Sequence, residues 1–186
     1  MTDLPAALPG GAVLRRFTID DAAALFAVVD ADRTRLGTWF PWVALTRSSR
    51  DEEAWIRRLR MDPDERDGLG IFVGDAVVGG AGLTVDPFRI DGEIGYWVRP
   101  DHEGRGLVTE AVRVLLREGF ERLGLHRITI RAGVGNARSR AIPERLGFRE
   151  EGVLRGAGKG TDGFYDLVVY GLLEDEWRAR EGAGGA

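Results

Sequence analysis

The 186-residue sequence contains no cysteine. This absence excludes disulfide bonds, thiolate metal ligands and any mechanism that holds a reacting group on a cysteine. Serine occurs only at Ser48, Ser49 and Ser139, none of which lies in the G-x-S-x-G turn of a serine hydrolase. The two histidines, His102 and His126, lack the spacing of a metal site. We therefore expect no metal, no cysteine-dependent mechanism and no serine hydrolase.

Long hydrophobic runs are missing as well. No stretch approaches the roughly 20 apolar residues that span a bilayer, and the first residues lack the basic segment and apolar block of an export signal. The net charge of −4 and the pI near 5.3 argue against the strongly positive face of a nucleic-acid-binding domain. We therefore expect a cytoplasmic protein that contacts neither membrane nor nucleic acid.

Lysine is nearly absent too, because Lys159 is the only one, so anion sites would be built from arginine. The length and the 44% hydrophobic content suit one domain with one buried core. We predict a flexible leader over residues 1–12, a single domain over 13–180 and a flexible tail over 181–186.

Strand and helix patterns alternate along the chain. Helical spacing follows Asp20-Asp21 and Gly106, and also covers 51–61 and 136–146, the last closed by Gly147. This alternation indicates a mixed α/β sheet. Short apolar runs predict strands at 12–17, 69–73, 77–85, 94–98, 128–130, 148–154 and 165–172.

The most informative segment runs from Glu93 to Glu110, E-I-G-Y-W-V-R-P-D-H-E-G-R-G-L-V-T-E. It predicts a strand, a glycine-rich turn and a long amphipathic helix. Free backbone N–H groups in such a turn, together with the positive end of the helix dipole, favour binding of a pyrophosphate. Gly104 and Gly106 allow the backbone to approach the phosphates without an intervening side chain.

A G-x-G sequence alone also fits an ordinary tight turn, and two other phosphate motifs are not met. The dinucleotide fingerprint G-x-G-x-x-G requires a third glycine where Thr109 stands. The G-x-x-x-x-G-K-[ST] loop is excluded because Lys159 is followed by Gly160. The function of the turn has to be judged from the rest of the sequence.

Several spaced motifs together resemble the GNAT superfamily of N-acetyltransferases, in the branch of the Rim-type ribosomal-protein N-terminal acetyltransferases. The resemblance covers residues 13–177 and implies the GNAT fold, with about seven strands and four flanking helices around a cleft where two parallel strands part. The matching segments are L-G-T-W-F-P-W-V (36–43), 93–98, 104–111, N-A-R-S-R-A-I-P-E-R-L-G-F (136–148), E-G-V-L-R (151–155), 162–166 and 172–177.

The resemblance implies direct transfer of an acetyl group from acetyl-CoA to a primary amine within a ternary complex. The acceptor would be the N-terminal α-amine of a protein or peptide, or the amine of a small molecule. Two alternatives keep the fold. One uses another coenzyme A thioester, such as succinyl-CoA, and the other is a non-catalytic regulator that only binds acyl-CoA.

The resemblance also implies the contacts of the coenzyme A thioester. The backbone at the end of the strand would hold the pantetheine arm and polarise the thioester carbonyl, and Asn136 would both cap its helix and contact the cofactor. The turn departs from the family's Q/R-x-x-G-x-G/A pattern at Glu103 and Val108, which brings an acidic side chain near the phosphates. The implied cofactor-binding residues are Trp97, Val98, Arg99, Gly104, Arg105, Gly106, Leu107, Val108, Thr109, Asn136, Ser139 and Arg145.

Two catalytic positions of the family are altered here. Pro143 stands where many members have a tyrosine that protonates the departing thiolate, and Gly158 stands where some Rim-type enzymes have a glutamate base. We therefore assign the base to Glu93, acting through water, and assign Ser139 to hydrogen-bond or protonate the leaving sulfur. In the simpler alternatives, Glu93 is a solvated strand residue and Ser139 bonds its own helix backbone.

Aromatic residues supply the candidates for binding the amine acceptor. Trp39 and Trp42 belong to the L-G-T-W-F-P-W-V segment, and Tyr165 and Asp166 belong to the D-G-x-Y-D turn. The tryptophans could instead pack in the core or form a subunit contact, which would make the protein a homodimer. Tyr165 and Asp166 could simply shape their turn.

Overall fold

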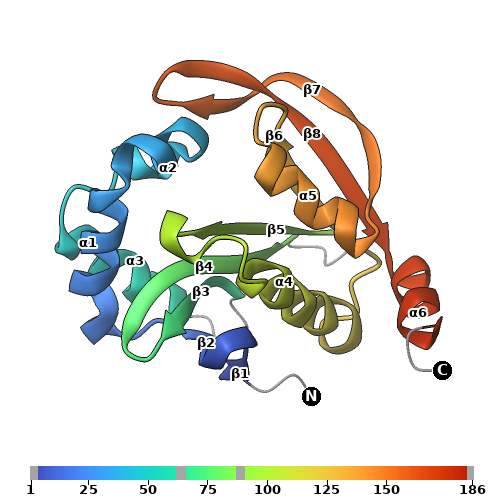
Figure 1. The fold of residues 1–186 in the computed structure, drawn as a ribbon, viewed down its shortest axis with the longest axis horizontal. Helices are drawn as coiled ribbons and strands as arrows, with labels where there is room; N and C mark the ends of the chain where they lie inside the picture. Colours follow the sequence, from blue (N-terminus) through green and yellow to red (C-terminus); the bar gives the residue numbers. More distant parts are fainter. Residues whose placement is uncertain (1–3, 62–65, 87–90, 184–186) are drawn as a thin grey trace.

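The computed structural model describes residues 4–61, 66–86 and 91–183. Its eight strands form one sheet in the order β1-β2-β3-β4-β5-β6-β8-β7 (Figure 1). The pair β5–β6 is parallel, and every other described pair is antiparallel. The strands are β1 Ala6–Ala7, β2 Ala12–Arg16, β3 Arg66–Val73, β4 Ala76–Val85, β5 Asp91–Val98, β6 Arg127–Gly133, β7 Arg149–Gly160 and β8 Gly163–Leu173.

Within the described ranges six α-helices flank this sheet, two more than predicted. The helix predicted after Asp21 is divided at Asp32, whose φ of −117° and ψ of 21° interrupt the helical backbone, and α6 was not predicted. Helix α4 continues into a π-helical segment, Glu118–Arg122. The helices are α1 Ala22–Ala31, α2 Arg33–Trp39, α3 Ser49–Leu59, α4 Leu107–Arg117, α5 Ala137–Leu146 and α6 Glu174–Ala183.

Part of the segment predicted as a leader forms a short strand, whereas its predicted flexibility stays a prediction. Ala6 and Ala7 pair with Leu14 and Val13 of β2, and this short β1 is the strand beyond the predicted seven. Leu8 is only 6% exposed, so burial of its apolar side chain ties this segment to the core. At the other end, α6 includes residues 181–183 of the predicted tail, and residues 184–186 lie outside the described part of the chain.

The sheet separates two layers of helices, as Figure 1 shows. Alternate residues of each strand face opposite sides. Ile94 of β5 packs in the core formed with α4, whereas Trp97 packs against the core formed with α1 and α3. The β7–β8 hairpin runs along the top of the view in Figure 1 and reaches α2, where the Thr161 N–H donates to the Gly37 carbonyl at 2.9 Å.

The parallel strands β5 and β6 part at the centre of the sheet. Their pairing covers Asp91↔Arg127, Gly92↔Ile128 and Glu93↔Thr129, whereas β5 continues to Val98 and β6 continues to Gly133. This arrangement confirms the predicted mixed α/β sheet and the predicted opening between two parallel strands. In the described part of the chain, no helix is both long enough and apolar enough to span a membrane.

Candidate active site

A cavity of about 820 Å³, called here the large cavity, lies where β5 and β6 part. Its walls are the end of β5, the turn before α4, the first residues of α4, and sides of α2 and α5. A cavity of this size suits a small-molecule ligand. Eleven of the twelve predicted cofactor-binding residues line it: Trp97, Val98, Gly104, Arg105, Gly106, Leu107, Val108, Thr109, Asn136, Ser139 and Arg145.

Arg99 is the predicted cofactor residue that the structure leaves out of this wall. Its guanidinium forms an ion pair with Asp101, with Nη2 and Oδ2 2.8 Å apart. Only one residue separates Arg99 from Asp101, so this ion pair is a local contact within the turn after β5. The role predicted for Arg99 belongs to its backbone beside the pantetheine arm, and it stays a prediction.

The turn before α4 has the backbone geometry of an anion site. Gly104 and Gly106 have φ values of 72° and 78°, in the left-handed region that costs other residues roughly 1–2 kcal/mol. Helix α4 begins at Leu107, and its first helical hydrogen bond runs from the Glu110 N–H to the Gly106 carbonyl, at 3.0 Å. The N–H groups of residues 107–109 come before this hydrogen bond, so they have no partner within the helix and point out from its start.

Arg145 of α5 adds a positive charge to the same place. Its Nη1 donates to the Thr109 hydroxyl at 3.1 Å, which ties α5 to the first turn of α4. A guanidinium beside a helix N-terminus can pair with a phosphate group while the helix N–H groups donate to it. The turn and Arg145 together could hold the diphosphate of a coenzyme A thioester.

Glu103, the acidic departure in the turn, is paired with two arginines. Its carboxylate accepts hydrogen bonds from Arg35 Nη1 at 3.2 Å and from Arg138 Nη1 at 2.6 Å. Arg35 also donates to the Val98 carbonyl at 2.7 Å and contacts Asp32. Arg35 therefore connects α2 to the end of β5, a connection that the sequence did not predict because its partners lie 63 and 68 positions away.

Tyr96 and Ser139 form a hydroxyl pair on the wall of the large cavity. The Tyr96 hydroxyl donates to the Ser139 carbonyl at 2.9 Å and lies 3.4 Å from the Ser139 hydroxyl. Burial raises the pKa of Tyr96 above its usual value, so its phenol remains protonated at neutral pH. The Asn136 side chain caps α5, as predicted, by accepting the Ser139 N–H at 3.2 Å.

Glu93, the predicted base, lies away from this cavity. Its carboxylate binds the Arg131 guanidinium of β6 through two contacts, one of which is 2.9 Å. The Glu93 side chain is 38% exposed and lines neither of the two cavities described here. The structure therefore does not bring Glu93 and Ser139 together.

The four residues predicted to bind the acceptor do not lie together on one cavity wall. Trp39 lines the large cavity and Trp42 lines a second cavity, whereas Tyr165 and Asp166 line neither. The Tyr165 hydroxyl donates to the Trp39 carbonyl at 2.6 Å, and the two rings form a T-shaped pair with centroids 5.3 Å apart. Asp166 Oδ1 accepts the Gly156 N–H at 2.7 Å. These contacts shape the β7–β8 hairpin and hold Trp39 in place.

Gly158 and Pro143, which stand at the two altered family positions, are both buried. Gly158 is buried, and a Cβ atom there would lie 2.2 Å from Cε2 of Tyr165. Pro143 is buried inside α5. Among the described residues, no group of three or more His, Asp or Glu side chains could hold a metal ion.

The second cavity, called here the small cavity, has a volume of about 500 Å³ and lies between α3 and the sheet. Phe40, Tyr96 and Trp97 line both cavities, so the two meet at these residues. Glu52 of α3 also lines the small cavity, although its residue is only 5% exposed. Burial, and then the nearby Asp51 charge, raise the pKa of Glu52 to about 7.

Glu52 and Tyr96 are the residues that the sequence analysis missed. Glu52, Ile56 and Leu59 are spaced four and three residues apart and are buried on one face of α3. A charged residue at the head of an apolar helical face is the one sequence signal that could have identified Glu52. Tyr96 gave no such signal, because an aromatic residue is ordinary in an alternating strand.

Known proteins match this chain over most of its length. The Acetyltransferase (GNAT) domain family matches residues 12–149. The "Putative ribosomal N-acetyltransferase YdaF" of Bacillus subtilis is 37% identical over 172 residues, covering 87% of this chain and 90% of that protein.

Two solved structures share the fold. One, described as a probable acetyltransferase, is 34% identical with a TM-score of 0.81 and covers 89% of this chain and 94% of its own. Mycobacterium smegmatis RimJ in complex with CoA-disulfide is 25% identical with a TM-score of 0.81, covering 98% of this chain and 96% of that one. With a family match over residues 12–149 and this agreement in fold, the chain belongs to the GNAT family of N-acetyltransferases.

Proposed function

We propose that this enzyme transfers the acetyl group of acetyl-CoA directly to a primary amine, with both substrates bound at once. The observation that carries the proposal is the turn from Gly104 to Thr109, which lines the large cavity with left-handed glycines, a helix N-terminus and Arg145. The named relatives support the choice of ligand, because the solved RimJ structure holds a coenzyme A disulfide.

Each wall of the large cavity has a part in this proposal. The N–H groups at the start of α4 and Arg145 would bind the diphosphate. The backbone of β5 beyond Glu93 would align the pantetheine arm along the edge that β6 no longer covers. The Tyr96–Ser139 pair would lie at the inner end of the cavity, where it shares its wall with the small cavity.

The reaction needs one proton removed and one supplied. The amine nitrogen attacks the thioester carbonyl carbon, so a C–N bond forms, the C–S bond breaks and the amine releases a proton. The departing sulfur takes up a proton and leaves as a thiol. We assign this last proton to the Tyr96–Ser139 pair, which is the hydroxyl pair on the cavity wall.

An acetyl donor is favoured over a carboxylated donor such as succinyl-CoA. A second carboxylate would need an unpaired arginine near the acyl end of the cavity. Arg35 is paired with Asp32 and Glu103, and Arg138 is paired with Glu103. Initial rates with acetyl-CoA and succinyl-CoA at equal concentrations would test this preference directly, and a faster rate with succinyl-CoA would contradict it.

The acceptor that we propose is the α-amine of a protein N-terminus. The match to a relative named as a ribosomal N-acetyltransferase supports this class. The test combines wild-type enzyme, acetyl-CoA and an unblocked peptide, and follows both the release of coenzyme A thiol and the mass of the peptide. An acetylated peptide formed together with an equal amount of free thiol is the expected result. Thiol release without peptide acetylation would refute the acceptor class.

A further inference from the structure

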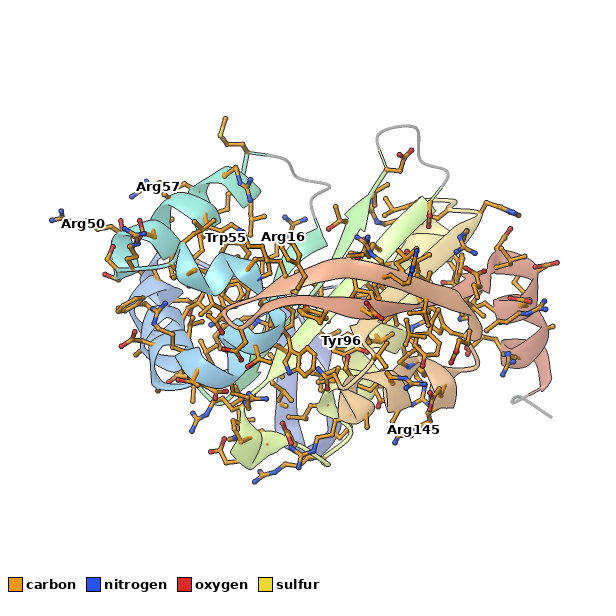
Figure 2. All side chains as sticks on the ribbon, turned by 90° about the horizontal axis from the view of Figure 1, so that it is seen from above. Arg16, Arg50, Trp55, Arg57, Tyr96 and Arg145 are labelled. Carbon is orange, nitrogen blue, oxygen red and sulfur yellow. The ribbon has the colours of Figure 1, made fainter. Side chains whose placement is uncertain are left out.

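The small cavity combines apolar walls with one buried acidic group. Phe17, Phe40, Trp42, Trp55 and Trp97 contribute aromatic side chains to these walls. Figure 2 shows Trp55 on the side of the sheet that carries α3, with Tyr96 lying between Trp55 and Arg145 in that view. The two cavities are adjacent, because both are lined by Phe40, Tyr96 and Trp97.

Glu52 is the unusual member of this wall. It is more than nine-tenths buried, and in the described part of the chain no side chain or backbone N–H hydrogen-bonds to its carboxylate or forms an ion pair with it. An ionised carboxylate in an apolar site is unfavourable unless it is paired. The other titratable groups on the wall are Asp51 and Arg58, both exposed, and the Tyr96 phenol.

We infer that the small cavity is the acceptor subsite and that Glu52 binds the amine substrate there as its ammonium ion. This inference rests on the proposed function. An ammonium group supplies the missing partner of the carboxylate, and the aromatic faces around it attract a cation as well. An amine that carries an apolar or aromatic group therefore fits this subsite, whereas an acidic group beside the amine would meet Glu52 and Asp51.

Glu52 would also receive the proton that the ammonium must lose. The ammonium gives its proton to the Glu52 carboxylate and becomes the neutral amine that can attack. The protonated Glu52 then returns the proton to solvent after the acetylated product leaves. Its place on the wall of the small cavity, and a pKa raised by burial to about 7, both suit this exchange.

The test uses binding and does not depend on turnover. Benzylamine and benzyl alcohol have the same apolar body, but only the amine is cationic at about pH 8. Three tryptophans line the cavity, so the intrinsic fluorescence of the protein reports occupancy. The wild type should bind benzylamine at least about tenfold more tightly than benzyl alcohol. Glu52→Gln should lose this preference. Glu53→Gln, which alters the neighbouring residue that faces Arg57, should keep it.

Two results would overturn the subsite, namely a preference that persists in Glu52→Gln or benzylamine binding that never saturates in the wild type. Steady-state kinetics separates this inference from the proposed function. Peptide acetylation with an unchanged peptide KM in Glu52→Gln would remove the subsite and leave the function standing. Selective benzylamine binding without any acetyl transfer would remove the function and leave the ammonium site standing.

Discussion

Single side chains join distant elements at the two ends of the large cavity, and we propose that they bind and react there. At the outer end, Arg145 is held against Thr109 and the start of α4. At the inner end, the Tyr96 hydroxyl is held between the carbonyl and the hydroxyl of Ser139. Each contact joins elements distant in sequence, so each role can be removed by one substitution without changing the turn itself.

Arg145→Ala should weaken acetyl-CoA binding by about tenfold, because a charge-assisted phosphate contact contributes about 1.5–3 kcal/mol and part of it is screened here by solvent. The KM for the amine should not change. Titration calorimetry with acetyl-CoA measures the effect. Arg113→Ala is the matched control, since Arg113 lies on the exposed side of α4 and pairs with Glu110. Equal affinities in wild type and Arg145→Ala would remove Arg145 from the cofactor site.

Tyr96→Phe should lower kcat by roughly ten- to a hundredfold, the lower range for loss of a general acid. The dissociation constant of acetyl-CoA should stay within about twofold, since the phenol faces the acyl end and not the diphosphate. Rapid-quench measurement of a single turnover isolates the chemical step. An unchanged single-turnover rate would show that the Tyr96 hydroxyl only positions Ser139.

At the scale of secondary structure, helix α5 and its N-cap place Asn136 and Ser139 on the wall of the large cavity. Its start is fixed by the Asn136 cap and its end by Gly147, which has a φ of 82°. Both ends could be predicted from the sequence, since a lone asparagine and a glycine bracket a helical pattern. Helix α4 was equally clear from its apolar spacing.

Asn136→Ala should lower the free energy of unfolding by about 1 kcal/mol, the ordinary effect of losing a helix cap. For a chain of this length the melting temperature should fall by roughly 2–4 °C. Asn136→Ser should restore most of this loss, because serine also accepts the N-terminal N–H. Thermal unfolding of the three proteins provides the measurement, and an unaltered melting temperature in Asn136→Ala would show that the 3.2 Å contact adds nothing.

The acid–base assignments could not be predicted as well as the elements. Glu93 sits on the strand that leads to the turn, which made it the natural candidate, but its carboxylate is held by Arg131 across the sheet. That pairing depends on the register of β5 against β6, which local sequence does not specify. The burial of Glu52 likewise depends on the sheet beneath α3.

For the whole molecule, Glu52 couples stability to pH. Its pKa is about 7 in the folded chain and near its ordinary value of 4.5 when unfolded. The folded state therefore binds the extra proton between these values, and stability should fall by roughly 3 kcal/mol as pH rises from about 4.5 to about 7. Urea unfolding at about pH 5 and about pH 8 should show this fall in wild type and Glu53→Gln, but not in Glu52→Gln. A parallel fall in all three proteins would contradict the assigned pKa.

The large cavity lies at the opening between β5 and β6, and it shares Phe40, Tyr96 and Trp97 with the small cavity. The family resemblance predicted this opening. It did not predict that α2 would be tied to β5 through Arg35, or that the β7–β8 hairpin would hold Trp39 through Tyr165. Both contacts join segments far apart in sequence, so they follow from the assembled fold and not from local pattern.

The central claim is that the start of α4 binds the diphosphate of a coenzyme A thioester. Thermal unfolding with acetyl-CoA, compared with S-acetyl-pantetheine, tests it most directly because the second ligand lacks the diphosphate. Acetyl-CoA at about a hundred times its dissociation constant should raise the melting temperature by roughly 5–10 °C, and S-acetyl-pantetheine at the same concentration should raise it far less. No shift with millimolar acetyl-CoA, or equal shifts with both ligands, would contradict the account.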